Sequence, residues 1–204
     1  MALMRFASLA LAVLLAACSK PVAPTAEPTA APTGASASAV PEAAEPTAPD
    51  GPISKYTSLK NCKVIEDGKG EDWSVSRCQG LGGYTLQLNY FDARESLDLI
   101  KDGKVTAELK LWLRGGGGFN ALGDTAEWRG NMRGGLFVPR ALIVRNNVIR
   151  DSAQPEKSTG VLEVIDLKRG CMVGAVEPQP GQNEAARAIA DAPPEKCVKF
   201  QPER

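Results

Sequence analysis

Histidine is absent from the 204-residue chain, and this absence limits the chemistry that its side chains can perform. A Ser-His-Asp triad, a Cys-His pair and a histidine-ligated metal centre all depend on an imidazole. The cysteines form no CxxC pair, so a zinc site built from thiolates is not predicted either. Catalysis would have to depend on carboxylates, lysine, tyrosine or serine. We therefore expect a protein that is not an enzyme and that needs no metal and no cofactor.

The candidate ligand-binding residues are charged side chains on predicted strands. In the stretch EWR, Glu127 and Arg129 share one face of a strand while Trp128 points to the other. If Trp128 faces the core, the two charged residues face solvent or a groove. Arg94 and Arg145 also stand at strand-like positions. These four residues could bind an anionic or sugar ligand through forked guanidinium donors, or they could form a cross-strand ion-pair network.

Three further features remain open at this stage. Asp92 and Glu127 could act together as acid and base on a glycan, which depends on a separation that the sequence does not set. Trp73, in the loop DGKGEDWS, is predicted to fold back over a neighbouring disulfide, and the alternative is a contact with a partner or a sugar. The glycine run 115–118 lacks the lysine and the helix of a phosphate loop, so it predicts a hairpin tip or a lid.

Four cysteines lie in the second part of the chain, and an even number in an exported protein predicts disulfides. Three pairings are possible. We predict Cys62–Cys78 and Cys171–Cys197, because each pair is close along the chain and flanks a turn-rich stretch.

The first 17 residues have the pattern of an export signal. One positive charge, Arg5, precedes an apolar run that is too short to cross a bilayer as a helix, which needs about 20 residues. The stretch LAAC, residues 15–18, resembles the lipobox of bacterial lipoproteins. That resemblance implies cleavage before Cys18, a diacylglycerol on its thiol and acylation of the new amino end. An ordinary secretory signal cut after Ala17 is the alternative.

Residues 18–52 are predicted to be a disordered tether between the lipid and the domain. They consist mainly of Ala, Pro, Thr and Ser, and they contain eight of the 15 prolines. Such a segment has too little apolar surface to offset the entropy lost on ordering. Ser19 stands where an aspartate would retain a lipoprotein in the inner membrane. The resemblance therefore implies attachment to the outer membrane of a bacterial envelope, facing the periplasm.

Residues 53–204 have the size of one domain. The chain has 24 basic and 24 acidic residues, of which two basic and four acidic ones precede residue 53, leaving 22 against 20. This near-neutral balance gives no field of a single sign, so nucleic acid is not an expected partner. The expected partners are the membrane, through the anchor, and an envelope protein or a glycan.

The fold class predicted from hydrophobic periodicity is mostly β. YTLQLNY (84–90) and VTAELKLWL (105–113) alternate apolar and polar residues, as half-buried strands do. ALIVR (141–145) and VLEVIDL (161–167) are apolar enough for central strands, and CMVGAV (171–176) is a further candidate strand. NEAARAIAD (183–191) predicts one short C-terminal helix capped by Asn183. The sequence thus indicates an antiparallel sheet, a sandwich or a barrel-like single domain.

Four short motifs follow one another in the domain: CxGxGGY (78–84), EWR (127–129), PxAxIVR (139–145) and ARxIAD (186–191). Together they resemble a group of exported proteobacterial proteins of unknown function, so the resemblance implies one strand-rich domain and no particular activity. We expect a non-catalytic binding or interaction domain. The alternatives are an inhibitor of a cell-wall hydrolase, similar in form to the lysozyme inhibitors, and a carboxylate-based glycan hydrolase.

Overall fold

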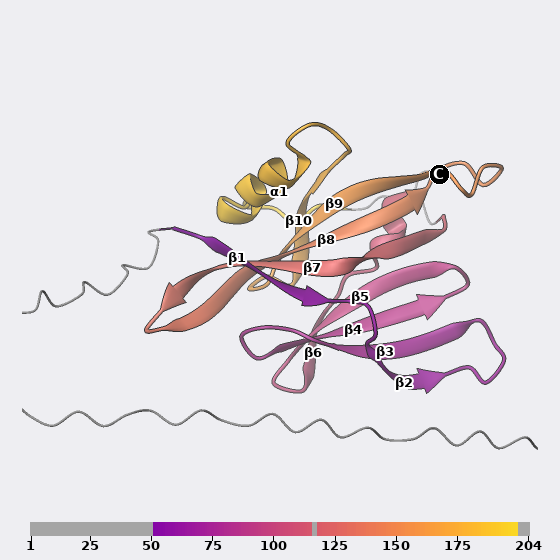
Figure 1. Ribbon diagram of the computed structural model, residues 1–204, viewed down its shortest axis with the longest axis horizontal. Helices are drawn as coiled ribbons and strands as arrows, with labels where there is room; N and C mark the ends of the chain where they lie inside the picture. Colours follow the sequence, from indigo (N-terminus) through magenta and orange to yellow (C-terminus); the bar gives the residue numbers. More distant parts are fainter. Residues whose placement is uncertain (1–50, 116–117, 200–204) are drawn as a thin grey trace, which may run out of the picture. The chain divides into compact units, whose positions relative to one another are not determined.

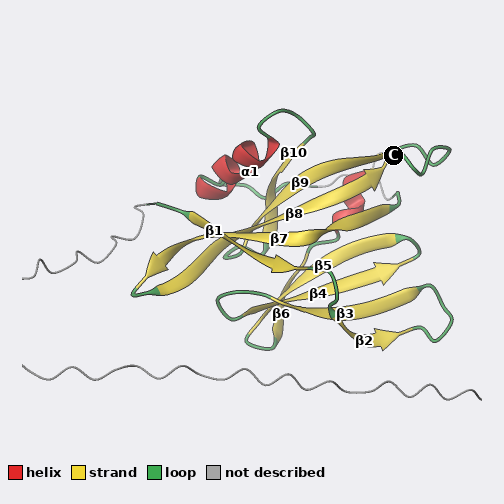
Figure 2. Cartoon of the chain, viewed as in Figure 1, coloured by secondary structure: helices red, strands yellow, loops and turns green. Residues whose placement is uncertain are grey.

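The computed structural model describes residues 51–115 and 118–199, which form two five-stranded antiparallel sheets and one α-helix (Figures 1 and 2). Sheet I has the order β1 (Ile53–Ser58), β7 (Asn120–Arg133), β8 (Leu136–Ile149), β9 (Ser158–Asp166) and β10 (Cys171–Val176). Sheet II has the order β2 (Lys63–Asp67), β3 (Trp73–Gln79), β4 (Tyr84–Phe91), β5 (Arg94–Lys101) and β6 (Lys104–Glu108). The predicted mostly-β class is confirmed, and the sheets do not close into a barrel.

The main core lies between the two sheets. Alternate residues of the central strands point into it, as the period of two requires. Its largest member is Trp128 on β7, which is fully buried and donates a hydrogen bond from Nε1 to Thr57 Oγ1 at 2.8 Å. Leu142 on β8 and Ile165 on β9 meet Leu86 and Leu97 of sheet II in the same cluster. The strands predicted to be central, β8 and β9, are central in sheet I.

A second, smaller core lies on the other face of sheet I, where helix α1 (Gln182–Asp191) packs. Ala186 and Ala190 are the buried residues of the helix, and Ile189 packs partly against the same cluster. The small alanines allow close approach to the strands. The layers are therefore α1, sheet I and sheet II (Figure 1). The cap is Gly181 and not Asn183 as predicted, because the chain enters the helix with a positive φ of 73° at that glycine.

The strand predicted over residues 105–113 is wrong in its second half. β6 ends at Glu108, and Leu111–Gly115 form a 3-10 helix, η1. Lys110 has a φ of 50°, which an extended strand does not allow, so the chain turns there. The turn brings Leu111 into the core between the sheets, while Val105 at the sheet edge is exposed.

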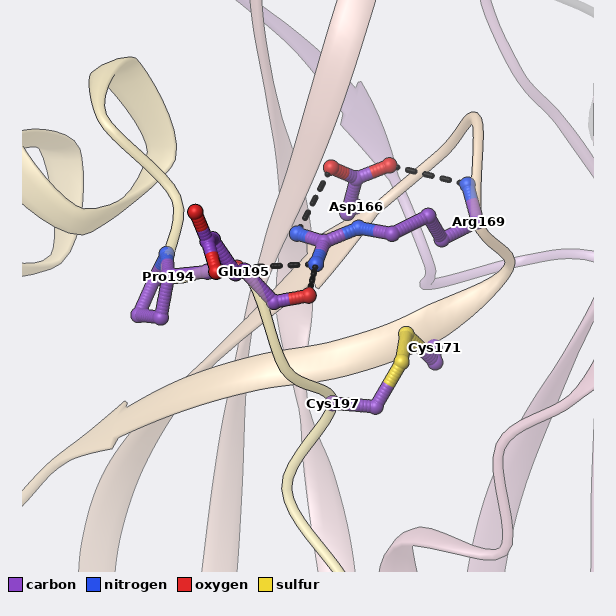
Figure 3. Close-up of a disulfide and its surroundings, with 6 residues drawn as sticks. All are labelled: Asp166, Arg169, Cys171, Pro194, Glu195 and Cys197. Carbon is purple, nitrogen blue, oxygen red and sulfur yellow. Dashed lines mark hydrogen bonds and ion pairs between the residues drawn. A yellow bond between two sulfur atoms is a disulfide. The ribbon is translucent and has the colours of Figure 1, made fainter.

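Both predicted disulfides are present. Cys62–Cys78 ties the start of β2 to β3, and Cys171–Cys197 ties the start of β10 to the segment after α1. Arg169 supports the connection made by the Cys171–Cys197 disulfide, which we call the C-terminal clamp (Figure 3). It donates to the main-chain oxygens of Pro194 and Glu195 at 2.8 and 2.7 Å and to Asp166. The C-terminal segment and the helix before it are thus fixed to the sheet.

The β7–β8 hairpin extends beyond its neighbours in sheet I. Strand β1 pairs with β7 only up to Gly130, and β9 pairs with β8 only from Ala141. Residues 131–138 therefore pair with each other alone, and they project from the sheet (Figure 1). We call these residues the projecting hairpin. Leu136, beside its turn, is 72% exposed.

Several predictions concern residues that are not described. The signal sequence 1–17, Cys18 and nearly all of the tether 18–52 lie outside the described residues, as do Gly116 and Gly117 of the glycine run and residues 200–204. Within residues 51–115 and 118–199, no helix has both the length and the apolar character that crossing a bilayer requires.

Candidate functional site

A cavity of about 340 Å³ opens where the amino-terminal part of α1 meets the outer face of sheet I. Its walls come from five elements or their connections: Tyr56 on β1, Glu127 on β7, Arg145 on β8, Leu162 on β9, and Asn183 and Arg187 on α1. Its size is at the lower end of the range of small-molecule sites. It is the candidate functional site because it gathers two of the four residues that the sequence singled out.

Glu127 is the best-connected acid in this cavity. Arg187 donates from Nε to Glu127 Oε1 at 2.7 Å and from Nη2 to Oε2 at 3.3 Å. Ser54 donates its hydroxyl to the same carboxylate, and Tyr56 OH accepts from Arg187 at 3.1 Å. The hydrogen bonds to Glu127 raise the pKa of Arg187 above its usual value. The negative charge of Glu127 is thus balanced by Arg187, and its carboxylate oxygens are hydrogen-bond acceptors in the cavity wall.

Arg129 lies two residues further on, on the same face of β7, and forms a forked ion pair with the last residue of α1. Its Nε and Nη2 donate to the two carboxylate oxygens of Asp191 at 2.8 and 2.7 Å, and Nη1 donates to Ser54 Oγ at 3.2 Å. The pair is mostly buried, with side-chain exposures of 15% and 28%. Arg129 therefore fixes the helix to the sheet. It forms a structural ion pair, which the sequence offered as the alternative to ligand binding, although the partner lies on the helix and not on a neighbouring strand.

Arg145 has a different environment. Its Nη1 donates to the main-chain oxygen of Gly160 at 3.2 Å and to Gln182 Oε1 at 3.1 Å. Both partners are neutral, and among residues 51–115 and 118–199 no carboxylate lies within ion-pair distance of Arg145.

Arg94 does not join this group. It begins β5 in sheet II, where it pairs with Asp92 and lies 5.1 Å from the ring centre of Phe119. Asp92 lies in the β4–β5 turn, next to Ala93, whose oxygen accepts from the Asn120 backbone at the start of β7. Asn120 lies opposite Val148 and Glu127 opposite Ile143, five residues apart on β8, so roughly 17 Å separates the two positions at strand spacing, and Glu127 faces α1. Two carboxyl groups must lie within about 10 Å to hydrolyse one glycosidic bond, so the Asp92–Glu127 pair is excluded.

Trp73 does not fold over the first disulfide, so that prediction is wrong. β3 pairs regularly with β4 from Trp73 to Gln79, and the five-residue step from Trp73 to Cys78 places the two side chains at opposite ends and on opposite faces of the strand. The indole Nε1 donates to Glu71 Oε2 at 2.9 Å. Contact with a partner stays a prediction for this residue.

Sequence reasoning missed an acid in the main core. Glu163 on β9 pairs with Val144, shares its inward direction and is fully buried. Its Oε1 accepts from Asn146 Nδ2 at 2.7 Å, while Oε2 has no hydrogen-bond partner among the described residues. Asn146 continues the polar chain to Asn120 at 2.8 Å and to Leu111 O at 3.0 Å. Desolvation raises the pKa of Glu163 to about 7. The sequence feature that could have indicated this buried acid is the single glutamate inside the apolar run VLEVIDL.

The cavity residues Tyr56 and Arg187 were also missed, as was Gln182, which accepts from Arg145 at the cavity wall. Arg187 lies in the predicted helix, whereas no element was predicted at Tyr56 or Gln182. Only the docking of α1 on sheet I brings the three side chains together. Comparison of the chain with protein families, with curated proteins and with solved structures returns no match.

Proposed function

We propose that the chain is a lipid-anchored protein of the bacterial cell envelope whose β domain binds a ligand or partner without transforming it. The cavity beneath α1 is the binding site. The observation that carries the proposal is the way the cavity is built. Polar and charged groups from sheet I and from α1, whose following segment is held by the Cys171–Cys197 disulfide, converge on one hollow. A rigid scaffold that presents convergent polar groups is typical of a small-molecule site.

Three features favour binding over catalysis. Of the two acids that line the cavity, Glu127 is held by the Arg187 guanidinium and the Ser54 hydroxyl, and Asp124 is paired with Lys60. The pair considered for hydrolysis, Asp92 and Glu127, is divided between two sheets. All four cysteines of the domain are consumed in disulfides, which leaves no thiol nucleophile there.

The binding role is tested by blocking the cavity. Thr125 is exposed at the cavity wall, and Thr125→Trp places an indole there. Val105 is exposed on the edge strand of sheet II, so Val105→Trp is the matched control. We expect low-molecular-weight envelope fractions to raise the melting temperature of the wild type and of the control, but not that of Thr125→Trp. Equal shifts in all three proteins would place the binding site elsewhere.

The anchor is tested on the mature amino end. Mass spectrometry of the protein from bacterial membranes should find a chain that begins at Cys18 and carries fatty acyl groups, because more than one chain is needed for stable anchoring. Cys18→Ser should release the protein from the membrane fraction. An unmodified mature terminus would refute the anchor and would leave the cavity proposal standing.

Inhibition of a cell-wall hydrolase is a second candidate, favoured by the projecting hairpin. Its turn carries Arg133 opposite Leu136, a cation beside an exposed apolar side chain. Such a tip could enter a cleft lined by catalytic carboxylates. Lysozyme is the probe: a complex at micromolar concentration that Arg133→Glu abolishes would support this candidate, and no complex at high micromolar concentration would remove it.

A further inference from the structure

The charged walls of the cavity are two acids and two arginines, and one of the arginines, Arg145, has no acid partner among the described residues. Of its charged walls, Glu127 is paired with Arg187 and Asp124 with Lys60 at 2.9 Å. Arg145 is left with two neutral acceptors, and both bonds use a single nitrogen, Nη1. Its Nε and Nη2 have no hydrogen-bond partner among the described residues. These two N–H groups lie on one edge of the guanidinium, which is the edge that binds an oxyanion with two parallel hydrogen bonds.

The strands are shaped around this arginine. A side chain at Gly160 on β9 would place its Cβ 2.9 Å from Arg145 Nη1, and one at Gly123 would place it 3.0 Å from Arg145 Cβ. The two glycines therefore leave the room in which the arginine lies. Gln182 fixes the far end, since its Nε2 donates to the main-chain oxygens of Gly160 and Val176, both at 2.9 Å, while its Oε1 accepts from Arg145. The guanidinium is thus pre-positioned at the cavity.

The charges of the cavity also select among anions. Asp124 and Glu127 line the same hollow, so a dianion such as phosphate would meet repulsion that a single negative charge meets less. The oxygens of Glu127 and Tyr56 accept hydrogen bonds, so they suit hydroxyl or amide donors on the remainder of the ligand.

We infer that the cavity binds a small polar molecule with one carboxylate, held by Arg145, and with hydrogen-bond donors that face Glu127 and Tyr56. Acidic sugars and peptide carboxyl ends share this chemistry. The inference rests on the proposed binding role of the cavity and adds the class of ligand.

The first experiment uses the wild-type protein with intact disulfides and matched probe pairs. D-glucuronate is compared with D-glucose, alanylalanine with its C-terminal amide, and inorganic phosphate is a separate arm. Binding is followed by NMR through the methyl groups of Ile143 and Leu162, which line the cavity. In at least one pair, we expect the probe that carries the carboxylate to bind tenfold or more tightly than its neutral counterpart. The pair that shows this difference tells whether the ligand is an acidic sugar or a peptide carboxyl end.

Two variants test the residue. Arg145→Gln should reduce carboxylate affinity about tenfold or more and change neutral-probe affinity less than twofold. Gly160→Ala keeps the positive charge of Arg145 but displaces it, because the new Cβ meets side-chain atoms that can move. This variant should therefore also reduce the affinity for the carboxylate probes. Arg150→Gln is the control, since Arg150 pairs with Glu177 away from the cavity. Melting temperatures without ligand check folding.

The outcomes separate the two levels of the proposal. If neutral and charged probes shift Ile143 and Leu162 equally, or if phosphate binds best, the carboxylate assignment is overturned while the cavity remains a binding site. If no probe shifts these methyl groups at high millimolar concentration, this inference fails, and the cavity-blocking experiment then decides the binding role by itself.

Discussion

Replacing Glu163 by glutamine should remove a large part of the pH dependence of folding stability. The side chain is fully buried, only one of its oxygens has a hydrogen-bond partner in the part of the chain that the structure describes, and burial raises its pKa to about 7. The folded protein therefore keeps the proton up to about pH 7, while the unfolded chain releases it near the usual value of 4.5. Stability contributed by the proton is present below pH 4.5 and is lost as the pH rises towards 7.

The magnitude follows from the two pKa values. Each pH unit between 4.5 and about 7 reduces the free energy of unfolding by about 1.4 kcal/mol through this group, so the full loss is about 3 kcal/mol. Glu163→Gln carries no titrating proton, and its amide oxygen can still accept from Asn146. Burial also raises the pKa of Glu95 and of Asp98. These two acids remain in the variant, so the difference between variant and wild type isolates Glu163.

The assay is urea unfolding from pH 4 to pH 8, followed by tryptophan fluorescence. We expect Glu163→Gln to gain about 3 kcal/mol relative to the wild type between pH 4 and pH 8. Glu156 is exposed, and Glu156→Gln serves as the matched control, with a profile parallel to that of the wild type. If the wild-type and Glu163→Gln profiles are also parallel, the buried carboxyl is not neutral at low pH and the reasoning fails.

Three further predictions concern stability. Gly130→Ala should destabilise the domain by about 2 kcal/mol or more, because its Cβ would lie 2.2 Å from a main-chain oxygen of β8; an unchanged melting temperature would contradict this close approach. Replacing both Cys171 and Cys197 by serine opens a loop of 26 residues and should cost about 3.5 kcal/mol in chemical unfolding, whereas a loss below about 1 kcal/mol would mean that the clamp is dispensable. A double-mutant cycle of Arg129→Ala and Asp191→Ala should give a coupling of about 1 kcal/mol for this mostly buried pair, and additive losses would exclude a role in fixing α1.

Part of the secondary structure followed from local patterns, whereas β1, β2, β3 and β5 were not predicted. Alternation identified β4, and apolar β-branched runs identified β8 and β9, because each face of a strand carries a residue type that matches its burial. The break in the strand over residues 105–113 was not predictable, since Lys110 is an ordinary residue and its positive φ follows from how Leu111 packs. The disulfide pairing was predictable because neighbouring cysteines were already close along the chain.

The candidate site was predictable only in part. The period of a strand correctly placed Trp128 on one face and Glu127 and Arg129 on the other, and the structure shows that Trp128 faces the core. The same period could not say which strands are neighbours, so Arg94 was grouped with residues from which a whole sheet separates it. Arg187 was overlooked because its role depends on where α1 docks.

The amino-acid sequence alone determined the mostly-β class, the short C-terminal helix and the apolar character of the central strands β8 and β9, because these depend on residue types and spacing within a single segment. Only the tertiary structure decided which charges meet. Glu127 pairs with Arg187, and Arg129 pairs with Asp191, each across about 60 residues of chain, while Arg145 pairs with no carboxylate among the described residues. Charge pairing depends on distances between elements that are remote in sequence, and those distances are set by how the helix and the sheets pack.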